Sequence, residues 1–423
     1  MLLVDFRNRK FYLNKSILLY KVIKMLEKKY HKEKIIHILS NEVGISPLKV
    51  KLKIEALFKE ISEMLLNDKN SKSFTVAPTD APIDWSCLTS PLGISLLLTY
   101  QCNLKCKHCL VGSFRDLQIL GLNVEDINRL AEQMETQEIL KISLNGGEPM
   151  MKEDFSRILE IFYLHNILIE LSTNGVLLNR ENIQLMNNFH VLTYILSLEG
   201  SNSKTNDFIR GDGTFRKIIN SISNIKKSSS FSEVEVEVTY GKHNLKEIEE
   251  IVVLLENLGV SRVQFARLRP WNYGNNLQHF IPSKKDIMYL NKKTIELHQK
   301  YNITVDGDIP ISKPLGCNLI LGFEILPNGD VLPCRIFEQC NNKKAVLLGN
   351  IKKKKLTTIW QSKKAQRIRS ITYKLAEKKP CDLCGNFSNF CATNYCIVEN
   401  YLKFGKFIPS VDQLKKCEMH VEI

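Results

Sequence analysis

Three cysteines stand close together in this chain, directly after an apolar run that ends at Leu98. They are Cys102, Cys106 and Cys109, and their spacing is C-x3-C-x2-C. Thiolates at this spacing can hold one iron–sulfur cubane by three of its four irons, which leaves the fourth iron without a protein ligand. A structural cluster or zinc site normally fills that position with a fourth Cys or a His. The spacing therefore indicates a metal site with an open position, where chemistry can take place.

A zinc site is the alternative at this point, because His108 lies between the second and third thiols. Three Cys and one His would make a structural zinc knuckle. The ring directly before Cys109 is, however, too close in sequence to turn back easily to the same metal. An aromatic ring there is better placed to lie against a ligand beside a cluster.

Four further motifs follow the cysteines, and they come after apolar runs such as Ile139–Leu144, Ile167–Leu171 and Val191–Leu196. In chain order they are Gly146-Gly147-Glu148-Pro149, Ser172-Thr173-Asn174-Gly175, Ser197-Leu198-Glu199-Gly200 and Ile209-Arg210-Gly211. Together with the cysteines, their order and strand context resemble the radical S-adenosylmethionine (SAM) superfamily. The resemblance implies a [4Fe–4S] cluster on the three cysteines and SAM bound to the open iron. It also implies a 5′-deoxyadenosyl radical that abstracts hydrogen from a substrate.

The resemblance extends to individual residues around SAM. The glycine backbone of Gly146–Glu148 would approach the methionine amino group, with the glutamate as a nearby acceptor, although a tight turn would need the same glycines. Ser197 and Glu199, on one face of a strand end, would bind the ribose or methionyl part. The planar guanidinium of Arg210 would pair with the SAM carboxylate, and a surface ion pair is its alternative. The expected cofactor-binding residues are His108, Gly146, Gly147, Glu148, Ser197, Glu199 and Arg210.

Length and composition bound the class of protein. A chain of 423 residues is too long for one ordinary domain, and 44% hydrophobic residues suffice for a sizeable core. No apolar run is long enough to span a membrane and the N-terminus lacks a secretory signal, so we expect a cytoplasmic protein without a membrane partner. Its 12 cysteines then indicate metal or redox chemistry rather than disulfides. The net charge of +14 comes without a nucleic-acid-binding motif, so no nucleic-acid partner is expected.

Residues 1–70 are predicted to form a winged-helix-like α+β domain. Two short strands, Leu2–Phe6 and Lys10–Leu13, precede three helical patterns that begin at Ser16, Lys32 and Ser46. This arrangement resembles the recognition domain of ribosomal-peptide maturases. The resemblance implies that a leader peptide binds by strand addition on the open edge of the hairpin. A generic accessory domain is the alternative, and the polar residues 71–92 are predicted to be a linker.

Residues 93–300 alternate apolar segments with helical patterns. The candidate strands are Ile94–Leu98, Leu140–Leu144, Ile167–Leu171, Thr193–Leu198, Glu233–Thr239 and Arg262–Ala266. Helical patterns at 123–137, 153–165 and 246–258 lie between them, and another follows at 284–300. Alternation of this kind builds a parallel sheet with helices outside, so we expect an α/β fold. Six such units predict the partial (β/α)6 TIM-like barrel of the radical SAM superfamily, with ligands at the C-terminal ends of the strands.

Residues 301–423 are Cys-rich and show fewer clear helices. The spacings Cys317-x11-Gly329-x4-Cys334 and Cys381-x2-Cys384-x6-Cys391-x4-Cys396, followed by Cys417, resemble the SPASM extension, with two spacings one residue longer. The segment before Cys334 predicts a hairpin with an Asn-Gly turn. The resemblance implies auxiliary cluster I on Cys317, Cys334 and Cys396, with Cys340 as a candidate fourth ligand. It implies auxiliary cluster II on Cys381, Cys384, Cys391 and Cys417, and two zinc sites are the alternative.

The three domains together resemble radical SAM/SPASM maturases of ribosomally made peptides, including the subtilosin-type maturase of bacteriocin biosynthesis. The resemblance implies oxidative crosslinking of a precursor peptide with a leader segment, through a thioether from a Cys sulfur to an α-carbon. It also implies an electron donor such as flavodoxin or ferredoxin. The alternatives are a carbon–carbon crosslink of the Lys–Trp type, a sulfatase-activating SPASM enzyme, and a zinc-binding scaffold that is not an enzyme.

Overall fold

The computed structural model describes residues 2–5, 10–13, 89–117, 121–137, 139, 141–228, 232–269, 275–307, 322–339, 342–377 and 401. They belong to two units, 1–83 and 84–423, which are considered separately. In the first unit, β1 (Leu2–Asp5) and β2 (Lys10–Leu13) pair antiparallel, with Leu2 opposite Leu13. The sequence predicts both strands. The three helices predicted after them lie outside the described residues, and the domain boundaries given above stay predictions.

The second unit is built on one sheet, whose strand order is β12-β11-β10-β3-β4-β5-β6-β7-β8-β9. Its six central strands are parallel and run in chain order. They are β3 (Gly93–Leu97), β4 (Lys141–Asn145), β5 (Leu168–Thr173), β6 (Val191–Ser197), β7 (Glu233–Tyr240) and β8 (Arg262–Arg267). The six strands predicted from the sequence are these six, and their predicted ends differ from the observed ends by at most two residues.

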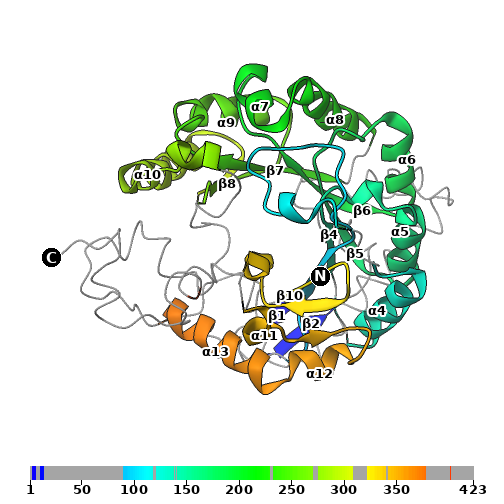
Figure 1. Cartoon of the computed structure of the whole chain (residues 1–423). Helices are drawn as coiled ribbons and strands as arrows, with labels where there is room; N and C mark the ends of the chain where they lie inside the picture. Colours follow the sequence, from blue (N-terminus) through cyan, green and yellow to red (C-terminus); the bar gives the residue numbers. More distant parts are fainter. Residues whose placement is uncertain are drawn as a thin grey trace, which may run out of the picture. The chain divides into compact units, whose positions relative to one another are not determined.

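Helices surround the strands, as Figure 1 shows for the arc from α4 to α10. Asn123 caps the first of them with a capping box, in which its side chain accepts a hydrogen bond from the backbone N–H of Asp126. The helices of this arc are α4 (Val124–Thr136), α5 (Phe155–Leu164), α6 (Arg180–Asn188), α7 (Ser203–Arg210), α8 (Thr214–Ser228), α9 (Ile248–Asn257) and α10 (Lys284–Lys300). The result is an α/β barrel-like sheet with helices outside, as the alternating pattern predicts.

Strand β7 shows how the sequence gives the sheet two different faces. Successive side chains of a strand point to opposite sides, and β7 alternates Glu with Val. The apolar side chains are buried in the core beneath the helices: Val234, Val236 and Val238. On the other face, Arg262 of β8 contacts Glu235 at 2.9 Å and Asp306 at 2.8 Å. The inner face of the barrel is therefore polar and charged.

The sheet is wider than the six strands predicted. β9 (Thr304–Asp306) pairs parallel with β8, and β10 (Gly322–Ile325) pairs parallel with β3. β11 (Asp330–Leu332) and β12 (Gly349–Asn350) add an antiparallel edge. β10 and β11 form the hairpin predicted before Cys334. β9 and β12 have three and two residues, too few to show a periodic pattern, which explains why the sequence did not predict them.

The segment after β10 contains both the predicted hairpin and helices that the sequence did not reveal. Gly329 has a φ of +88° in the turn between β10 and β11, which fits the Asn-Gly signal. The helices are α11 (Lys343–Val346), α12 (Leu356–Trp360) and α13 (Lys363–Glu377). None of the helices in the described ranges is long and apolar enough to cross a membrane.

Candidate active site

The three cysteines lie in the loop that leaves the C-terminal end of β3, where parallel barrels place their ligands. Cys102, Cys106 and Cys109 are free thiols of intermediate burial. The Cys102 sulfur is approached by the backbone N–H of Leu104 at 3.4 Å and by the side-chain amide of Asn174 at 3.7 Å. Burial raises the pKa of Cys102, and it raises that of Cys106 to about 11. Metal binding at these thiols would therefore have to displace protons.

Two glycines hold the neighbouring β4 loop against the cysteine loop. The N–H of Gly147 donates to the carbonyl of Thr99 at 2.7 Å, and that of Glu148 donates to the carbonyl of Gln101 at 2.8 Å. Gly146 has a φ of +155°, and a Cβ on it would lie 2.5 Å from the Thr99 oxygen. A Cβ on Gly147 would lie 2.2 Å from the oxygen of Gln101. The close approach of two backbones explains why both residues are glycine.

Glu148 is fully buried and its carboxylate is held by protein donors. It accepts hydrogen bonds from the Thr173 hydroxyl at 2.8 Å, the Asn174 N–H at 2.9 Å and the Met150 N–H at 3.3 Å. Burial nevertheless raises the pKa of Glu148 to about 7. Glu148 therefore joins the end of β4 to the end of β5. Its carboxylate is occupied by donors from the protein, so it holds the loop in place and is not a free acceptor for a ligand.

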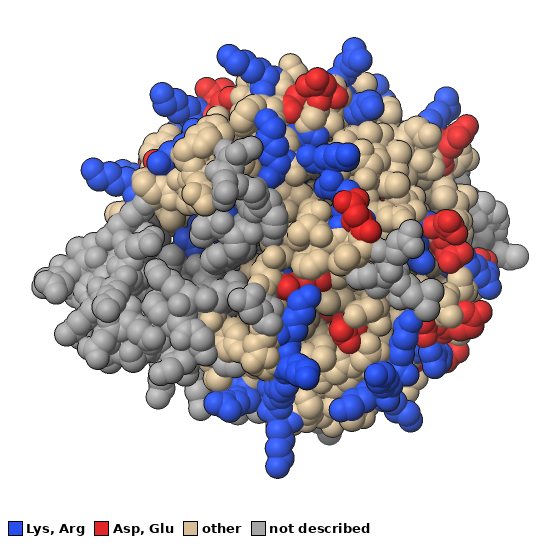
Figure 2. All heavy atoms as spheres, in the orientation of Figure 1, with Lys and Arg blue, Asp and Glu red and all other residues tan. Residues whose placement is uncertain are grey.

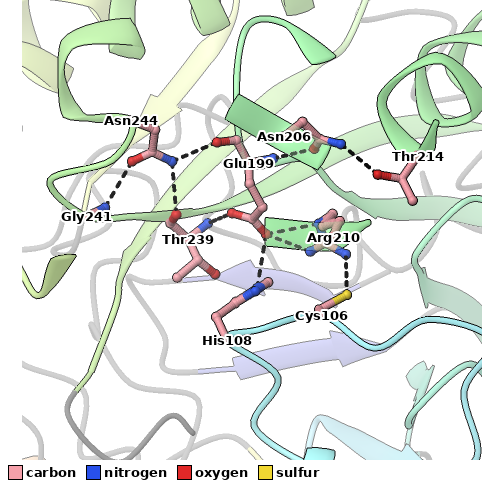
Figure 3. A network of polar contacts seen from close by, with 9 residues as sticks. All are labelled: Cys106, His108, Glu199, Asn206, Arg210, Thr214, Thr239, Gly241 and Asn244. Carbon is pink, nitrogen blue, oxygen red and sulfur yellow. Dashed lines mark hydrogen bonds and ion pairs between the residues drawn. The ribbon is translucent and has the colours of Figure 1, made fainter. Parts of the chain in front are cut away.

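Glu199 is the centre of a polar network at the end of β6 (Figure 3). Its Oε1 accepts from Arg210 Nε at 3.1 Å and Nη2 at 2.6 Å, and it lies 3.2 Å from Nε2 of His108. Its Oε2 accepts from the N–H of Thr239 at 2.7 Å. The third nitrogen of Arg210, Nη1, lies 4.0 Å from the sulfur of Cys106. Arg210, expected to meet a SAM carboxylate, thus already has a carboxylate partner within the protein.

The charges in this network compensate one another. Burial alone would raise the pKa of Glu199, but Arg210 and His108 outweigh it and hold that pKa below its usual value. Both members of the ion pair are buried, with 0% of Glu199 and 7% of Arg210 exposed. The α7 end that carries Arg210 is tied to the cysteine loop by a hydrogen bond from Lys107 N–H to the Ile209 carbonyl at 2.9 Å. The pair therefore connects β6 with the loop that bears the three thiols.

Several residues that complete this network were not found from the sequence. Asn206 accepts from the Glu199 N–H at 2.9 Å and donates to the Thr214 hydroxyl at 2.9 Å. Asn244 donates to the Glu199 carbonyl at 2.9 Å and accepts from the Gly241 N–H at 2.9 Å (Figure 3). The available signal was weak, since each is an Asn in a loop or a first helical turn near a strand end.

His243 is a further residue that sequence reasoning missed. Its ring packs edge-on against Phe280 at 5.5 Å between centroids. Neither ring nitrogen has a hydrogen-bond partner among the described residues. Burial lowers the pKa of His243 to about 4, against the opposing field of Glu199, so the ring is neutral at ordinary pH. It contributes an uncharged polar wall beside the network.

Ser197 and Cys334 complete the predicted site residues that the structure describes. Ser197 is the last residue of β6, half-buried and opposite Glu237 of β7 in the sheet register. Cys334 follows the β10–β11 hairpin and is of intermediate burial. The other predicted metal ligands lie outside the described residues: Cys317, Cys340, Cys381, Cys384, Cys391, Cys396 and Cys417.

A second apolar core, separate from that of the barrel, carries two of the cysteines. It includes Leu97, Tyr100, Phe337, Val346 and Ile368, and both Cys109 and Cys334 pack against it. The Tyr100 hydroxyl donates to the buried carboxylate of Glu338, and the Tyr100 ring lies 5.4 Å from that of Phe114. The thiol loop after β3 and the segment after β11 are therefore packed on one shared core.

The residues present fit an iron–sulfur cluster with a polar ligand beside it. A cubane takes its three protein sulfurs on three different irons, so they need not converge on one point. In the described part of the chain, no three His, Cys, Asp or Glu side chains gather tightly enough for a single metal ion. Nδ1 of His108 is buried without a hydrogen-bond partner among the described residues, and so is available to a ligand.

Fold and site together define the class of protein. The barrel has three thiols and a buried Glu–Arg pair at the ends of its parallel strands. Its residues 96–255 match the family model of the radical SAM superfamily. The SPASM model, an iron–sulfur cluster-binding domain, matches residues 317–386. The chain therefore carries a radical SAM domain at 96–255 and a SPASM domain at 317–386, as its cysteine spacings predict. It is an enzyme whose domains bind SAM, a [4Fe–4S] cluster and further iron–sulfur clusters.

Curated relatives of the chain include peptide maturases. The mycofactocin maturase MftC of Mycobacterium ulcerans is 28% identical over 188 residues, which cover 44% of this chain and 50% of the relative. The subtilosin biosynthesis protein AlbA of Bacillus subtilis is 25% identical over 315 residues, 72% of this chain and 67% of that protein. The chain thus spans about half the length of the mycofactocin maturases that it matches.

Solved structures share the fold. SuiB of Streptococcus suis, bound to its precursor peptide SuiA, superposes with a TM-score of 0.59 at 17% identity, over 100% of this chain and 95% of that one. The enzyme anSMEcpe with bound AdoMet superposes with a TM-score of 0.59 at 18% identity, over 73% and 91%. At these identities the likeness supports the fold, and the α/β barrel with its C-terminal extension agrees with both.

Proposed function

We propose that the chain is a peptide maturase that oxidatively crosslinks a ribosomally made precursor peptide, by joining a Cys sulfur to an α-carbon. The observation that carries the proposal is the thiol loop with its buried Glu199–Arg210 pair at the mouth of a radical SAM barrel. A SPASM extension follows that barrel, and relatives of the chain bear the names of maturases for mycofactocin and subtilosin biosynthesis.

In this proposal Cys102, Cys106 and Cys109 hold the cluster. SAM would be held by His108, Ser197, Glu199, Arg210 and the backbone of Gly146 and Gly147, as the resemblance implies. When bound, these groups supply a radical that can take a hydrogen atom from a substrate carbon. The protein's part is orientation: Arg210 and Glu199 order each other before any ligand arrives, which reduces the entropy lost on binding. Glu148 shapes the site indirectly, because its carboxylate holds the β4 and β5 ends together.

The auxiliary ligands follow the SPASM pattern. We place cluster I on Cys317, Cys334 and Cys396, with Cys340 as a candidate fourth ligand. Cluster II would be held by Cys381, Cys384, Cys391 and Cys417. The support is the iron–sulfur domain match at 317–386, which includes five of these eight cysteines.

The proposed reaction balances as an oxidation. A thioether bridge replaces one S–H and one Cα–H bond of the peptide with one S–Cα bond. One hydrogen atom leaves from the α-carbon, and the thiol hydrogen leaves as a proton and an electron. That electron needs an acceptor near the peptide, which is a role for a SPASM cluster.

The proposed function also implies two partners, a leader peptide and an electron donor. Residues 1–70 would bind the leader of the precursor peptide along the edge of the β1–β2 hairpin. A one-electron donor such as flavodoxin or ferredoxin would reduce the cluster, and the cytoplasm supplies such donors.

Co-expression with a precursor peptide tests this function. The peptide should lose two hydrogens per bridge, and fragmentation should place the new bond on a Cys sulfur. A bridge between two carbons would favour the Lys–Trp type of crosslink instead. Full activity on a leader-bearing peptide after deletion of residues 1–75 would favour a sulfatase-activating type of enzyme. A peptide of unchanged mass, made with enzyme that carries its full iron content, would contradict the proposal.

A further inference from the structure

The segment that covers the second core is unusual in charge. Residues 340–376 contain eleven Lys or Arg and no Asp or Glu, in a chain with 45 acidic residues. Some lysines elsewhere in the structure lie beside carboxylates. Lys293 and Lys300, for example, each contact Glu249 at 2.7 Å. The absence of carboxylates from 340–376 is therefore a local property of this segment, beyond the general excess of Lys in the chain.

The charges of this segment form an exposed surface, here called the basic face. It comprises Lys344, Lys353, Lys354, Lys355, Lys363 and Arg367, all of them exposed. Within the described ranges none of the six has an ion-pair partner, whereas nearby Lys352 lies 3.4 Å from Asp126. Figure 2 shows Lys and Arg side chains along the lower edge of the molecule, where Figure 1 places α12 and α13. Helices α11 and α13 are joined by hydrogen bonds from Lys364 Nζ to the carbonyls of Lys344 and Leu347, at 3.0 and 3.1 Å.

The α11 and α13 part of the basic face lies outside the core that carries two cysteines, whereas Lys353–Lys355 precede α12, whose apolar side is buried in the barrel core. Val346 of α11 and Ile368 of α13 are buried in that core, and Cys109 and Cys334 pack against it. Lys343 of α11 lies over the ring of Phe114, with Nζ 5.1 Å from the ring centroid. Phe114 in turn lies against Tyr100, two residues before Cys102. Lys343, Phe114 and Tyr100 thus form a series of side-chain contacts from α11, next to the basic face, to the thiol loop.

We propose that the basic face is the docking surface for an acidic electron-donor protein of the flavodoxin or ferredoxin class. A carrier must bind, deliver one electron and leave, so long-range attraction over a small interface suits it better than a tight apolar contact. In the encounter the donor is oxidised by one electron and a cluster of this enzyme is reduced by one. The inference rests on the proposed reduction of the cluster and does not depend on which peptide is modified.

The test compares two triple charge reversals in the full-length holoenzyme. Lys353→Glu, Lys354→Glu and Lys363→Glu alter the basic face. Three exposed lysines on α8 and α10 supply a control of equal charge change, as Lys217→Glu, Lys227→Glu and Lys292→Glu. The measurement is the anaerobic rate of cluster reduction by a bacterial flavodoxin hydroquinone, followed by visible bleaching, against the rate with reduced methyl viologen.

The basic-face variant should be reduced by flavodoxin at least about tenfold more slowly at low salt, because steering by complementary charge is worth that much or more. The control variant should stay within about twofold of wild type, and methyl viologen should reduce all three proteins equally. High salt should lower the rate of the wild type toward that of the variant, since salt screens the attraction.

Equal slowing of cluster reduction in both variants, or no slowing in either, would overturn the proposal. A basic-face variant with a normal flavodoxin rate but weaker binding of nucleic acid or of an acidic leader would assign the face to that partner instead.

Neutral variants guard against misfolding. The triple variant Lys353→Gln, Lys354→Gln and Lys363→Gln should keep its iron content. Flavodoxin should reduce its cluster at a rate between those of the wild type and the charge-reversal variant. Since cluster reduction is measured without any peptide, failure of the peptide-maturase function would leave this test intact.

Discussion

Arg210 and Glu199 form a buried ion pair in which Nε and Nη2 of the arginine both reach Oε1 of the glutamate, at 3.1 and 2.6 Å. The same arginine points Nη1 toward the Cys106 sulfur. One side chain thus links the strand end that carries Glu199 to the loop that carries the thiols. Sequence motifs 104 residues apart meet at this contact.

Breaking the pair from one side should be costly, while removing both charges should not. Arg210→Met leaves the Glu199 carboxylate buried without its cation, and we expect a loss of about 3–5 kcal/mol in the free energy of unfolding. The double variant Arg210→Met/Glu199→Met should recover most of that loss. Urea unfolding of the metal-free wild type, both single variants and the double variant, under reductant, measures this double-mutant cycle. Additive losses in the double variant would show that the two residues act independently.

Glu148 should make stability depend on pH in a defined direction. Its pKa is about 7 in the folded protein against an ordinary value of 4.5, so the folded state holds this proton more tightly than the unfolded state. The contribution is fully present below the unfolded pKa and is lost as pH rises through about 7. It amounts to on the order of 3 kcal/mol.

The isosteric variant isolates this group. The difference in unfolding free energy between wild type and Glu148→Gln should shift by that amount, against the wild type, from about pH 4 to about pH 8. Unfolding of the metal-free protein in urea at the two pH values provides the measurement. If the difference in unfolding free energy between the two proteins were the same at both pH values, Glu148 would have the same pKa in the folded and unfolded chains.

Two buried tyrosines give a matched comparison of hydroxyl groups. The Tyr100 hydroxyl donates to buried Glu338, whereas that of Tyr194, 0% exposed, has no hydrogen-bond partner among the described residues. Tyr100→Phe should therefore lower the free energy of unfolding by about 1–3 kcal/mol, and Tyr194→Phe should leave it unchanged or raise it. Equal effects of the two changes would argue against a role for the Tyr100–Glu338 contact.

Gly147 should tolerate no side chain. A Cβ would lie 2.2 Å from the Gln101 carbonyl oxygen, so Gly147→Ala must push the β4 loop away from the cysteine loop. We expect this variant to bind less of the cluster proposed on Cys102, Cys106 and Cys109, and therefore to release less iron on acid treatment. Gly93→Ala is the control, because its Cβ would meet its nearest atom at an ordinary 3.4 Å. Full iron content in Gly147→Ala would contradict the packing described here.

Much of the barrel could be predicted because each strand is a short apolar run before a distinctive motif. The thiol loop, the glycines and the Glu199 region were found for the same reason, as they follow strand ends directly. The partner of Glu148 could not be predicted, since Thr173 and Asn174 reach it across the sheet and not along the chain. The role expected for Arg210 omitted Glu199, because nothing local in the sequence indicates that the two meet.

The edge of the sheet and the helices after it lay beyond sequence reasoning for a different reason. β9 has three residues and β12 has two, so neither shows an alternating pattern. In the sequence, Lys352–Lys355 is only a short run of like charges. Its significance depends on α11 and α13, which bring other lysines beside it and bury their inner faces in the second core.

The production of 5′-deoxyadenosine from SAM tests the central claim most directly. The reconstituted full-length protein, reduced without oxygen, should release it, and the variant with Cys102, Cys106 and Cys109 all changed to Ala should release none while retaining iron in its SPASM domain. Product formed equally by both proteins, or by neither at full iron content, would contradict the assignment of these three thiols to the catalytic cluster.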